Sequence, residues 1–362
     1  FFKLKNFTDS LLDYLTNSPH LQKDVKKYVE NWIKEGLVDW DITRDISWGV
    51  PVPIEGLKNK VFYGWFDNHL AYISSTLKFL NDKNIDGKTF WNEADIYHFI
   101  GKDIVYHHYL FLPAMRLGID KEFKLPDYIP TRGHLTLQGK KISKSRNWYI
   151  GLKDFLEVFP ADYLRFYLIS INPYSQDDLN FDWEQFSTKI NSELIGNLGN
   201  LVNRVLGFTT KAFDGIVPEP EEFDEKDKES EKKIKSLAED VSKLMQENHL
   251  DRALKKLMEF SAHFNQYFQH KEPWKKGPGT NTCIYLSVSA VHSLAICLQS
   301  FLPKSSQKIW DQLGLKGNIS EIDWAAMSEL SLKSGHKIGT VTPIFSKIEP
   351  SVIEQEQSKL GK

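Results

Sequence analysis

The sequence predicts an α/β region followed by an all-α region. Up to about residue 155, short apolar segments typical of strands alternate with helical patterns, which indicates a parallel sheet. Beyond that point the apolar residues recur at helical spacing, in segments 161–170, 184–213, 228–270 and 280–302. We therefore expect part of a parallel sheet first and a helical bundle after it.

Individual elements follow from local signals. Two helices are expected within 7–36, the second opened by Ser18-Pro19 and ended by Gly36. Strands are expected at 60–66, 95–101 and 127–137, with a helix at 103–118. The charged stretch 217–233 carries two prolines and is expected to be a solvated connection between helices.

Composition narrows the class of protein. The 362 residues suffice for two or three domains, and 46 basic against 48 acidic residues leave a net charge of −2. Any nucleic-acid partner must therefore be bound by a local patch. Cys283 and Cys297 share one apolar helical stretch, which supports neither a disulfide framework nor a zinc site and fits a reducing compartment. Polar residues within 283–302 favour a buried bundle helix over a membrane span, and no signal peptide is visible.

A donor-rich loop, "GKKISKSRN" at 139–147, follows the last predicted strand. Lys141 and Lys144 are point cations that suit phosphate oxygens, and the hydroxyls of Ser143 and Ser145 add donors. Strand ends are where α/β proteins bind ligands, so we interpret this loop as a polyphosphate site. The alternative is a surface turn rich in lysine and serine.

Two further stretches suggest ligand contacts. Gly101 ends a predicted strand, and the Asp103 carboxylate just after it can accept both hydroxyls of a ribose; alternatively Asp103 is a helix N-cap. Trp65 and Tyr72 are close enough in sequence to line one apolar pocket, although the stretch taken alone favours core packing.

The helical region carries a third set of candidates. Asn200 and Arg204 lie four residues apart, on one face of a helix, and Trp274 follows a helix-stopping proline. An amide, a guanidinium and an exposed indole suit unstacked bases, through base-edge hydrogen bonds and stacking. The alternative is three unrelated surface residues.

Together these stretches resemble methionyl-tRNA synthetase, a class I aminoacyl-tRNA synthetase. "KISKS" resembles the class I signature loop, and "ITRDISWGVPVP", "FIGKDIVYHHYLFLPAM" and "GHLTLQGKKISKSRN" follow the order and spacing of that family. So do "GNLGNLVNR", "EPW" and "GHKIGTVTPIFSKIE", and the resemblance covers nearly the whole chain.

The resemblance implies roles for the candidates, as part of an enzyme that activates methionine with ATP and Mg²⁺ and transfers it to tRNA(Met). Lys141 and Lys144 would hold ATP phosphates, Gly101 and Asp103 the ribose, and Leu135 the adenine through its backbone. Further roles fall to Arg44 at the ATP or adenylate site, to Trp65, Tyr72 and His108 around methionine, and to Asn200, Arg204 and Trp274, which would read the CAU anticodon.

The resemblance also implies a division of the chain and a missing part. Residues 1–125 would be the second half of a Rossmann-like catalytic domain, 126–180 a signature-loop and stem-contact region, and 181–362 the anticodon-binding bundle with a C-terminal tail. The family's first-half signature and zinc knuckle find no match here, so the chain resembles a C-terminal half that is inactive alone, and a separate chain carrying the other half is an implied partner. The methionine pocket departs from the family at Asn68, His69, His107 and Leu112.

Two other functions stay open. The chain could be a tRNA-binding module without catalysis, against which both lysines of the intact loop argue. It could instead be a class I synthetase for another amino acid, such as cysteine, leucine or valine, against which Asn200, Arg204 and Trp274 argue. A cytoplasmic location is expected in each case, with no membrane partner.

Overall fold

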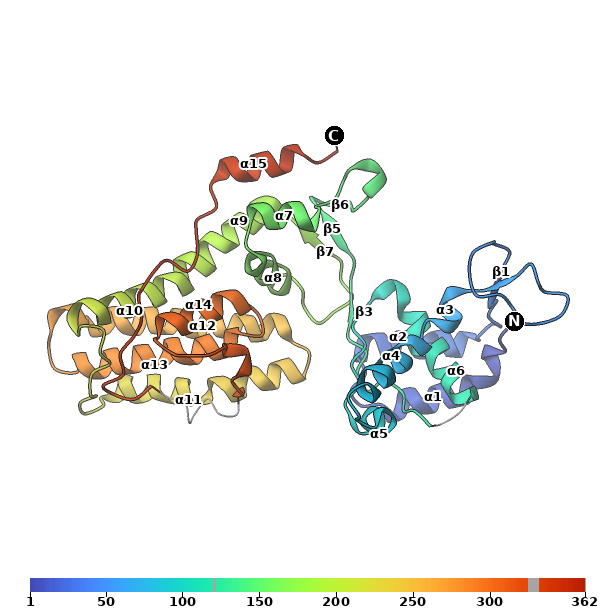
Figure 1. The fold of residues 1–362 in the computed structure, drawn as a ribbon, viewed down its shortest axis with the longest axis horizontal. Helices are drawn as coiled ribbons and strands as arrows, with labels where there is room; N and C mark the ends of the chain where they lie inside the picture. Colours follow the sequence, from blue (N-terminus) through green and yellow to red (C-terminus); the bar gives the residue numbers. More distant parts are fainter. Residues whose placement is uncertain (120–121, 325–331, 362) are drawn as a thin grey trace. The chain divides into compact units, whose positions relative to one another are not determined.

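The computed structural model describes residues 1–119, 122–324 and 332–361. It divides into two compact units, Phe1–His134 with Ser175–Asp178, and Leu135–Tyr174 with Leu179–Lys362 (Figure 1). The predicted order, with the α/β region first and the helices after it, is confirmed. The three-part division at 125 and 180 stays a prediction, because a compact unit is not the same thing as a functional domain.

The first unit consists of short helices and short strand pairs. Strand β1 (Thr43–Arg44) pairs antiparallel with β2 (Val61–Phe62), and β3 (Ile100–Gly101) pairs in parallel with β4 (Thr131–Arg132). Its helices are the 3-10 helix Leu4–Phe7, α1 (Thr8–Asn17), α2 (Lys23–Glu35), α3 (Gly64–Asp67), α4 (Leu70–Asn81), α5 (Gly87–Glu93), the 3-10 helix Lys102–Ile104, the π-helix His107–Phe111 and α6 (Leu112–Ile119). Most of them enclose one core that includes Leu11, Val25 and Tyr109, while Ile73 of α4 and Trp91 of α5 belong to a smaller, separate cluster.

The second helix begins later than predicted. Ser18-Pro19 does not open it; α2 starts at Lys23, because the preceding Gln22 is extended. The buried Gln22 side chain is held there, since its oxygen accepts a hydrogen bond of 2.8 Å from the Thr131 amide of β4. Gly36 ends the helix as predicted.

All three predicted strands are shorter than expected. Within 95–101 only β3 is a strand, and Tyr97 forms an isolated bridge with Tyr128. Within 60–66 only β2 is a strand, and α3 begins at Gly64. The aromatic residues that suggested a longer strand reach the core from this helical turn. The predicted strand 127–137 divides at Gly133 into β4 and β5, which belong to different sheets. A Cβ atom on Gly133 would lie 1.9 Å from the carbonyl oxygen of Asp177, so the returning segment requires glycine there.

The second unit joins a small sheet to a helical bundle. Strand β5 (Leu135–Leu137) pairs antiparallel with β6 (Lys140–Lys141) and in parallel with β7 (Leu179–Phe181). The helices are the 3-10 helix Lys144–Arg146, α7 (Leu152–Val158), α8 (Ala161–Ser170), α9 (Trp183–Lys189), the π-helix Ile190–Gly199, α10 (Asn200–Ala212), α11 (Glu225–Gln246), α12 (Leu250–Lys271), the 3-10 helix Pro273–Lys275, α13 (Thr280–Leu298), α14 (Pro303–Gln312), the 3-10 helix Ile319–Glu321 and α15 (Pro350–Ser358).

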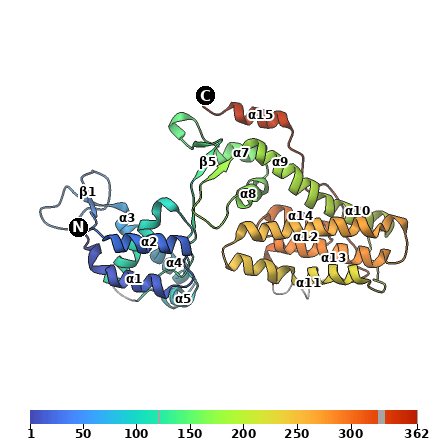
Figure 2. The ribbon, with the colours of Figure 1, turned by 180° about the vertical axis from the view of Figure 1, so that it is seen from behind.

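Helix α13 forms the centre of the bundle. Helices α10, α11, α12 and α14 all pack on it, and Figure 2 shows the same neighbours from behind. By length and composition α13 could cross a membrane, but 89% of its apolar window is buried inside the protein. It is therefore the core helix predicted from its sequence. The predicted segment 228–270 is two helices, separated at Asn248, whose φ of 62° breaks the helix.

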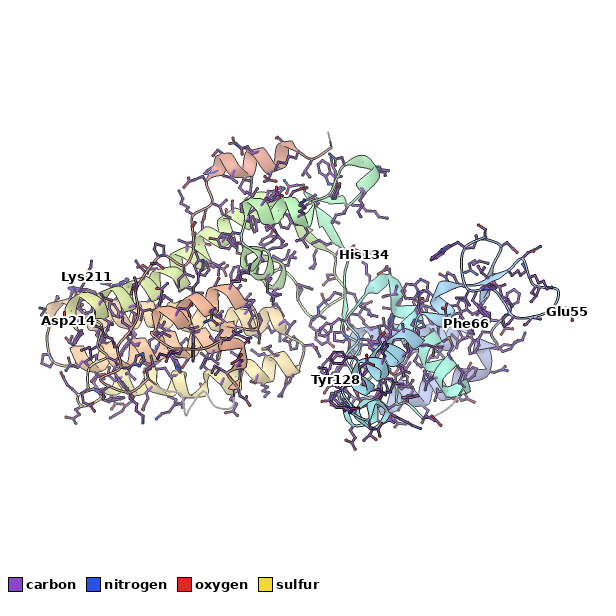
Figure 3. The ribbon with its side chains drawn as sticks, in the orientation of Figure 1. Glu55, Phe66, Tyr128, His134, Lys211 and Asp214 are labelled. Atoms are coloured by element: carbon purple, nitrogen blue, oxygen red, sulfur yellow. The ribbon has the colours of Figure 1, made fainter. Side chains whose placement is uncertain are left out.

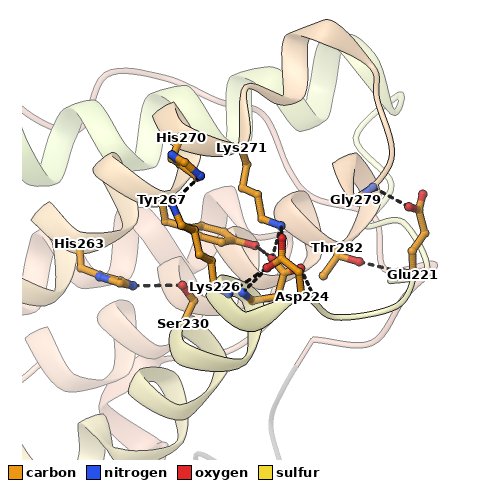
Figure 4. A network of polar contacts seen from close by, with 11 residues as sticks. Glu221, Asp224, Lys226, Ser230, His263, Tyr267, His270, Lys271, Gly279 and Thr282 are labelled. Atoms are coloured by element: carbon orange, nitrogen blue, oxygen red, sulfur yellow. Dashed lines mark hydrogen bonds and ion pairs between the residues drawn. The ribbon is translucent and has the colours of Figure 1, made fainter.

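An ionic cluster joins the start of α11 to the end of α12; we call Asp224, Asp227, Tyr267 and Lys271 the Lys271 cluster. Asp227 and Tyr267 are buried and Asp224 is exposed; Figure 4 labels Asp224, Tyr267 and Lys271. Lys271 Nζ lies 2.8 Å from Asp224 Oδ2 and 2.7 Å from Asp227 Oδ1. The Tyr267 hydroxyl donates to Asp227 Oδ1 at 2.6 Å. Asp224 and Asp227 also form a capping box, which starts α11 at Glu225. The predicted connection 217–233 is therefore irregular only up to Asp224 and helical beyond it.

We expect Lys271→Met to lower the free energy of unfolding of the second unit by about 3–5 kcal/mol, because Asp227 is 1% exposed and would keep an uncompensated charge. The Lys271 hydrogen bond lowers the pKa of Asp224 to about 2, so its share of this stabilisation is complete above pH ~4 and disappears as the pH falls towards 2. Urea unfolding at pH 7 and pH 2.5 measures both effects.

The control is Lys235→Met, which removes an exposed ion pair with Glu231 on α11. It should cost no more than about 0.5 kcal/mol. Equal losses for the two variants would show that the Lys271 cluster is not a stabilising contact.

Candidate functional site

The structure brings the three predicted methionine-pocket residues together in the first unit. The Tyr72 hydroxyl lies 3.0 Å from His108 Nε2, and His108 Nδ1 lies 3.1 Å from the Ile104 carbonyl oxygen. Because a carbonyl only accepts, Nδ1 must carry the proton, and Nε2 accepts from Tyr72. The Trp65 ring lies 6.3 Å from that of His108, in a T-shaped contact.

Three more imidazoles surround His108. Ring centroids lie 5.2 Å away for His69 and 5.8 Å for His98, and His107 packs 4.4 Å from Trp65. Burial, together with the neighbouring imidazoles, lowers the pKa of His69 to about 3 and that of His98 to about 4. Both histidines are therefore uncharged at neutral pH, and Arg116 and Lys124 line the same small hollow. His98 was missed because a single histidine in a predicted strand carries no signal of its own.

We expect the stability of the first unit to fall between pH 6.5 and pH 4. The unfolded chain takes up protons near pH 6.5, whereas folded His69 and His98 resist protonation until about pH 3 and 4. Each contributes a slope of about 1.4 kcal/mol per pH unit in that window.

Urea unfolding from pH 4 to 7.5 gives this slope, and His69→Phe should remove one histidine's share of it. A slope that is unchanged in the variant would mean that His69 is protonated in the folded pocket.

The two ribose candidates also lie in the first unit. Gly101 ends β3, and a Cβ there would meet Asp103 Oδ1 at 2.6 Å, so glycine lets the carboxylate rest against the strand end. Asp103 is exposed, and its Oδ1 lies 3.5 Å from His134 Nε2. The alternative role of Asp103 as a helix N-cap is wrong, because Gly101 holds that position and no side-chain capping bond forms.

Arg44 is fixed rather than free. Its guanidinium lies 3.8 Å above the Tyr63 ring, and its Nη1 donates to the carbonyl oxygens of Asp41 and Thr43 at 3.1 and 2.7 Å. The side chain is 37% exposed, and its Nη1 also lies 3.4 Å from Asp41 Oδ2, so an anion would compete with this carboxylate.

The signature loop belongs to the second unit. Lys141 ends β6 and Lys144 starts a 3-10 helix; both are exposed, and neither forms an ion pair with any residue that the structure describes. Ser143 and Trp148 close the loop through paired backbone hydrogen bonds of 2.8 and 2.9 Å. The Ser143 and Ser145 hydroxyls lie 3.2 Å apart. The loop thus presents cations that are not paired with any carboxylate in the part of the chain that the structure describes.

Two contacts hold the base of this loop, one of them from the far end of the chain, and no local sequence pattern predicted them. The Gly361 amide donates to the Asn147 carbonyl at 2.9 Å. The indole of Trp148 donates to the Leu137 carbonyl at 2.9 Å, which ties the loop to β5 next to Leu135, the predicted adenine contact.

The base-reading candidates share one surface of the bundle. Asn200 Nδ2 donates to Asn265 Oδ1 at 2.9 Å, and Arg204 Nη2 donates to Gln269 Oε1 at 2.8 Å. The Arg204 guanidinium lies 5.7 Å from the ring of Trp274, which is 41% exposed. The alternative of three unrelated residues is wrong for Arg204 and Trp274, since they are in cation–π contact.

Asn265 and Gln269 were missed by sequence reasoning. They lie four residues apart on α12, the same spacing as Asn200 and Arg204 on α10. Two side-chain hydrogen bonds, one turn apart, therefore link the two helices. That matched spacing was the only available signal, and it needs knowledge of which helices are neighbours.

The family of the chain follows from comparison with known proteins. Residues 1–206 match the family described as "tRNA synthetases class I (M)", and residues 227–350 match "Anticodon-binding domain of tRNA ligase". The chain belongs to the class I tRNA synthetases of group M. The resemblance to methionyl-tRNA synthetase is thereby confirmed.

Its relatives include two archaeal enzymes named "Methionine--tRNA ligase". The one from Methanopyrus kandleri is 40% identical over 99% of this chain and 53% of its own length. The one from Pyrococcus furiosus is 41% identical over 96% of this chain and 50% of its own length. The chain thus spans about half the length of the curated relatives it matches.

Solved structures give the same family. A Mycobacterium tuberculosis methionyl-tRNA synthetase in complex with methionyl-adenylate matches with a TM-score of 0.85 and 29% identity, over 94% of this chain and 67% of that one. The apo form of the enzyme matches with a TM-score of 0.83 and 27% identity, over 97% and 69%. The predicted class I fold with a helical anticodon-binding region is therefore confirmed.

Proposed function

We propose that this chain is the part of a methionine–tRNA ligase that carries the signature loop and reads the anticodon of tRNA(Met). The observation that carries the proposal is the shared surface of Asn200, Arg204 and Trp274, in a chain of this family. Each side chain is held by a neighbour and still faces solvent, which suits recognition of unstacked bases.

The signature loop supports the activation step. ATP, with Mg²⁺ as its counter-ion, brings phosphate charge that Lys141 and Lys144 would meet, with Ser143 and Ser145 as added donors. As the methionine carboxylate attacks the α-phosphorus, negative charge moves onto the departing pyrophosphate. A preorganised cation stabilises that charge without reorganisation. Gly101, Asp103 and Leu135 would position the nucleoside, and Arg44 would add a further positive charge.

The aromatic pocket supports methionine as the amino acid. Trp65 supplies an apolar wall, and the Tyr72–His108 hydrogen bond fixes the polar rim in one tautomer. The uncharged histidines add no positive charge of their own beside a thioether, which is only a weak acceptor. The remaining half of the catalytic domain would come from a separate chain or from a longer form of this protein, in the cytoplasm.

In a complete ligase, we expect Lys144→Ala to slow adenylate formation about 100-fold, or about 3 kcal/mol, because the lysine stabilises charge that develops in the transition state. Methionine affinity should change little. Methionine-dependent pyrophosphate exchange measures both quantities, and Lys153→Ala on α7 is the exposed-lysine control. If methionine affinity falls as far as the rate, Lys144 does not act on the phosphates.

We expect Trp274→Ala to weaken binding of a CAU hairpin by about 1–3 kcal/mol through loss of stacking. Arg204→Ala should in addition reduce the preference for CAU over altered triplets, because its hydrogen bonds carry base identity. Fluorescence titration of the chain with hairpins of each sequence measures this. Equal losses for every triplet would exclude sequence reading by these residues.

A further inference from the structure

A cleft of about 840 Å³ runs along the C-terminal half of α10. One wall is α10 and the turn that follows it; the other is the segment 337–341, which approaches from the far end of the chain. Figure 3 labels Lys211 and Asp214 on the first wall. Its size is within the usual range for a ligand site, about 300–1,000 Å³.

The second wall is held rigidly by backbone contacts. The Ile338 amide donates to Gly215 O at 2.8 Å, and the Gly339 amide donates to Gln312 O at 2.9 Å. A Cβ on Gly339 would lie 2.6 Å from the Asp311 carbonyl oxygen, so only glycine allows this segment to pass so close to α14. The cleft is therefore a fixed feature of the fold.

The cleft carries a net positive charge. Arg204, Lys211 and Lys337 face a single carboxylate, that of Asp214. Among the described residues, Arg204 and Lys211 form no ion pair, and the Lys337 amine donates to the backbone carbonyl of Asp214. A surface of this kind attracts a polyanion.

A second depression on the bundle lacks this property. Between α11 and α12, Lys256 lies 3.0 Å from Asp240 and Lys233 lies 3.6 Å from Glu229. Three carboxylates, Glu229, Asp240 and Glu259, balance its three lysines. A net positive charge thus distinguishes the α10 cleft from this charge-balanced groove.

The cleft continues the base-reading surface. Arg204 belongs to both, and Gly207 and Lys211 follow it at helical spacing on the same face of α10. At 1.5 Å per residue, Lys211 lies about 10 Å beyond Arg204 along the axis. That distance is more than one nucleotide of a single strand, given about 3.4 Å per phosphate along a helical strand.

We propose that this cleft binds the single-stranded RNA next to the triplet that Asn200, Arg204 and Trp274 read, with the backbone phosphates on Lys211 and Lys337. The proposal rests on the proposed function. Phe208 adds an apolar wall, and the exposed Asn203, Thr210 and Thr340 offer hydrogen bonds to sugar or base edges. Gly207 leaves the floor open, since a Cβ there would meet no atom within 4 Å.

The test uses two variants with different physical effects. Lys211→Ala removes a cation, so it should weaken binding of a CAU hairpin about fivefold at 0.1 M salt and reduce the slope of log affinity against log salt by about 0.7. Gly207→Leu fills the cleft and keeps every charge, so it should weaken binding with an unchanged slope. Leucine also favours a helix over glycine, so thermal unfolding should confirm that the bundle is intact.

The trinucleotide CAU, followed by NMR titration, separates this proposal from triplet reading. Both variants should bind the trinucleotide like the wild type, whereas Trp274→Ala should weaken both probes. Lys235→Ala on α11 is the charge control and should change neither.

Two results would overturn the cleft proposal while leaving triplet reading intact: hairpin binding unchanged in both variants, or equal losses for hairpin and trinucleotide. A wild-type chain that binds neither probe would overturn the proposed function and the cleft proposal together.

Discussion

The Lys271 cluster fixes the position of α12, and the candidate RNA surface depends on that helix. Lys271 is the last residue of α12 and is tied to Asp224 and Asp227 at the first turn of α11. Trp274 follows three residues later, so its orientation depends on where α12 ends. Asn265 and Gln269, six and two residues before Lys271, hold the two side chains of α10. A buried ion pair adds little net stability by itself, but it penalises every arrangement in which its partners separate. It therefore specifies one register between these helices.

The hydrogen bonds between α10 and α12 position the base-reading groups without using up their donors. An arginine side chain has five N–H donors, and Gln269 takes one from Arg204, which leaves the others for a ligand. The Asn200 amide donates one hydrogen to Asn265 and keeps its carbonyl oxygen as an acceptor. Holding side chains in place before binding lowers the entropy cost of ordering them on the RNA. The signature loop is arranged similarly: the Trp148 indole hydrogen bond holds its base, and the side chains of Lys141 and Lys144 are exposed to solvent.

The sequence predicted those features that depend on local periodicity or on spacing within a motif. Helix α8 has the predicted bounds, 161–170, because its pattern is decided within its own turns. Asn200, Arg204, Trp274 and the loop lysines were found from motif spacing. What could not be predicted depends on distant contacts. The predicted strand 127–137 is interrupted at Gly133, where the backbone of Asp177 lies against it. Asn265 and Gln269 form hydrogen bonds with residues of α10 that lie 65 positions earlier in the sequence. The cleft on α10 needs a wall from residues 337–341, which no local pattern connects to Lys211.

A net charge of −2 hides an uneven distribution of charge, and this explains how a nearly neutral chain can offer an RNA surface. On α11 and α12 most of the opposing charges cancel at close range, as in Lys235 with Glu231 and Lys256 with Asp240. Such pairs are screened and present little field to solvent. On α10 the cations Arg204 and Lys211 bond to an amide or to solvent, so their field persists outside the protein. Affinity for a polyanion depends on the cations that can replace its counterions, and paired lysines cannot do so without losing their carboxylates. The pairing pattern, rather than the total charge, therefore decides which face of the bundle meets nucleic acid.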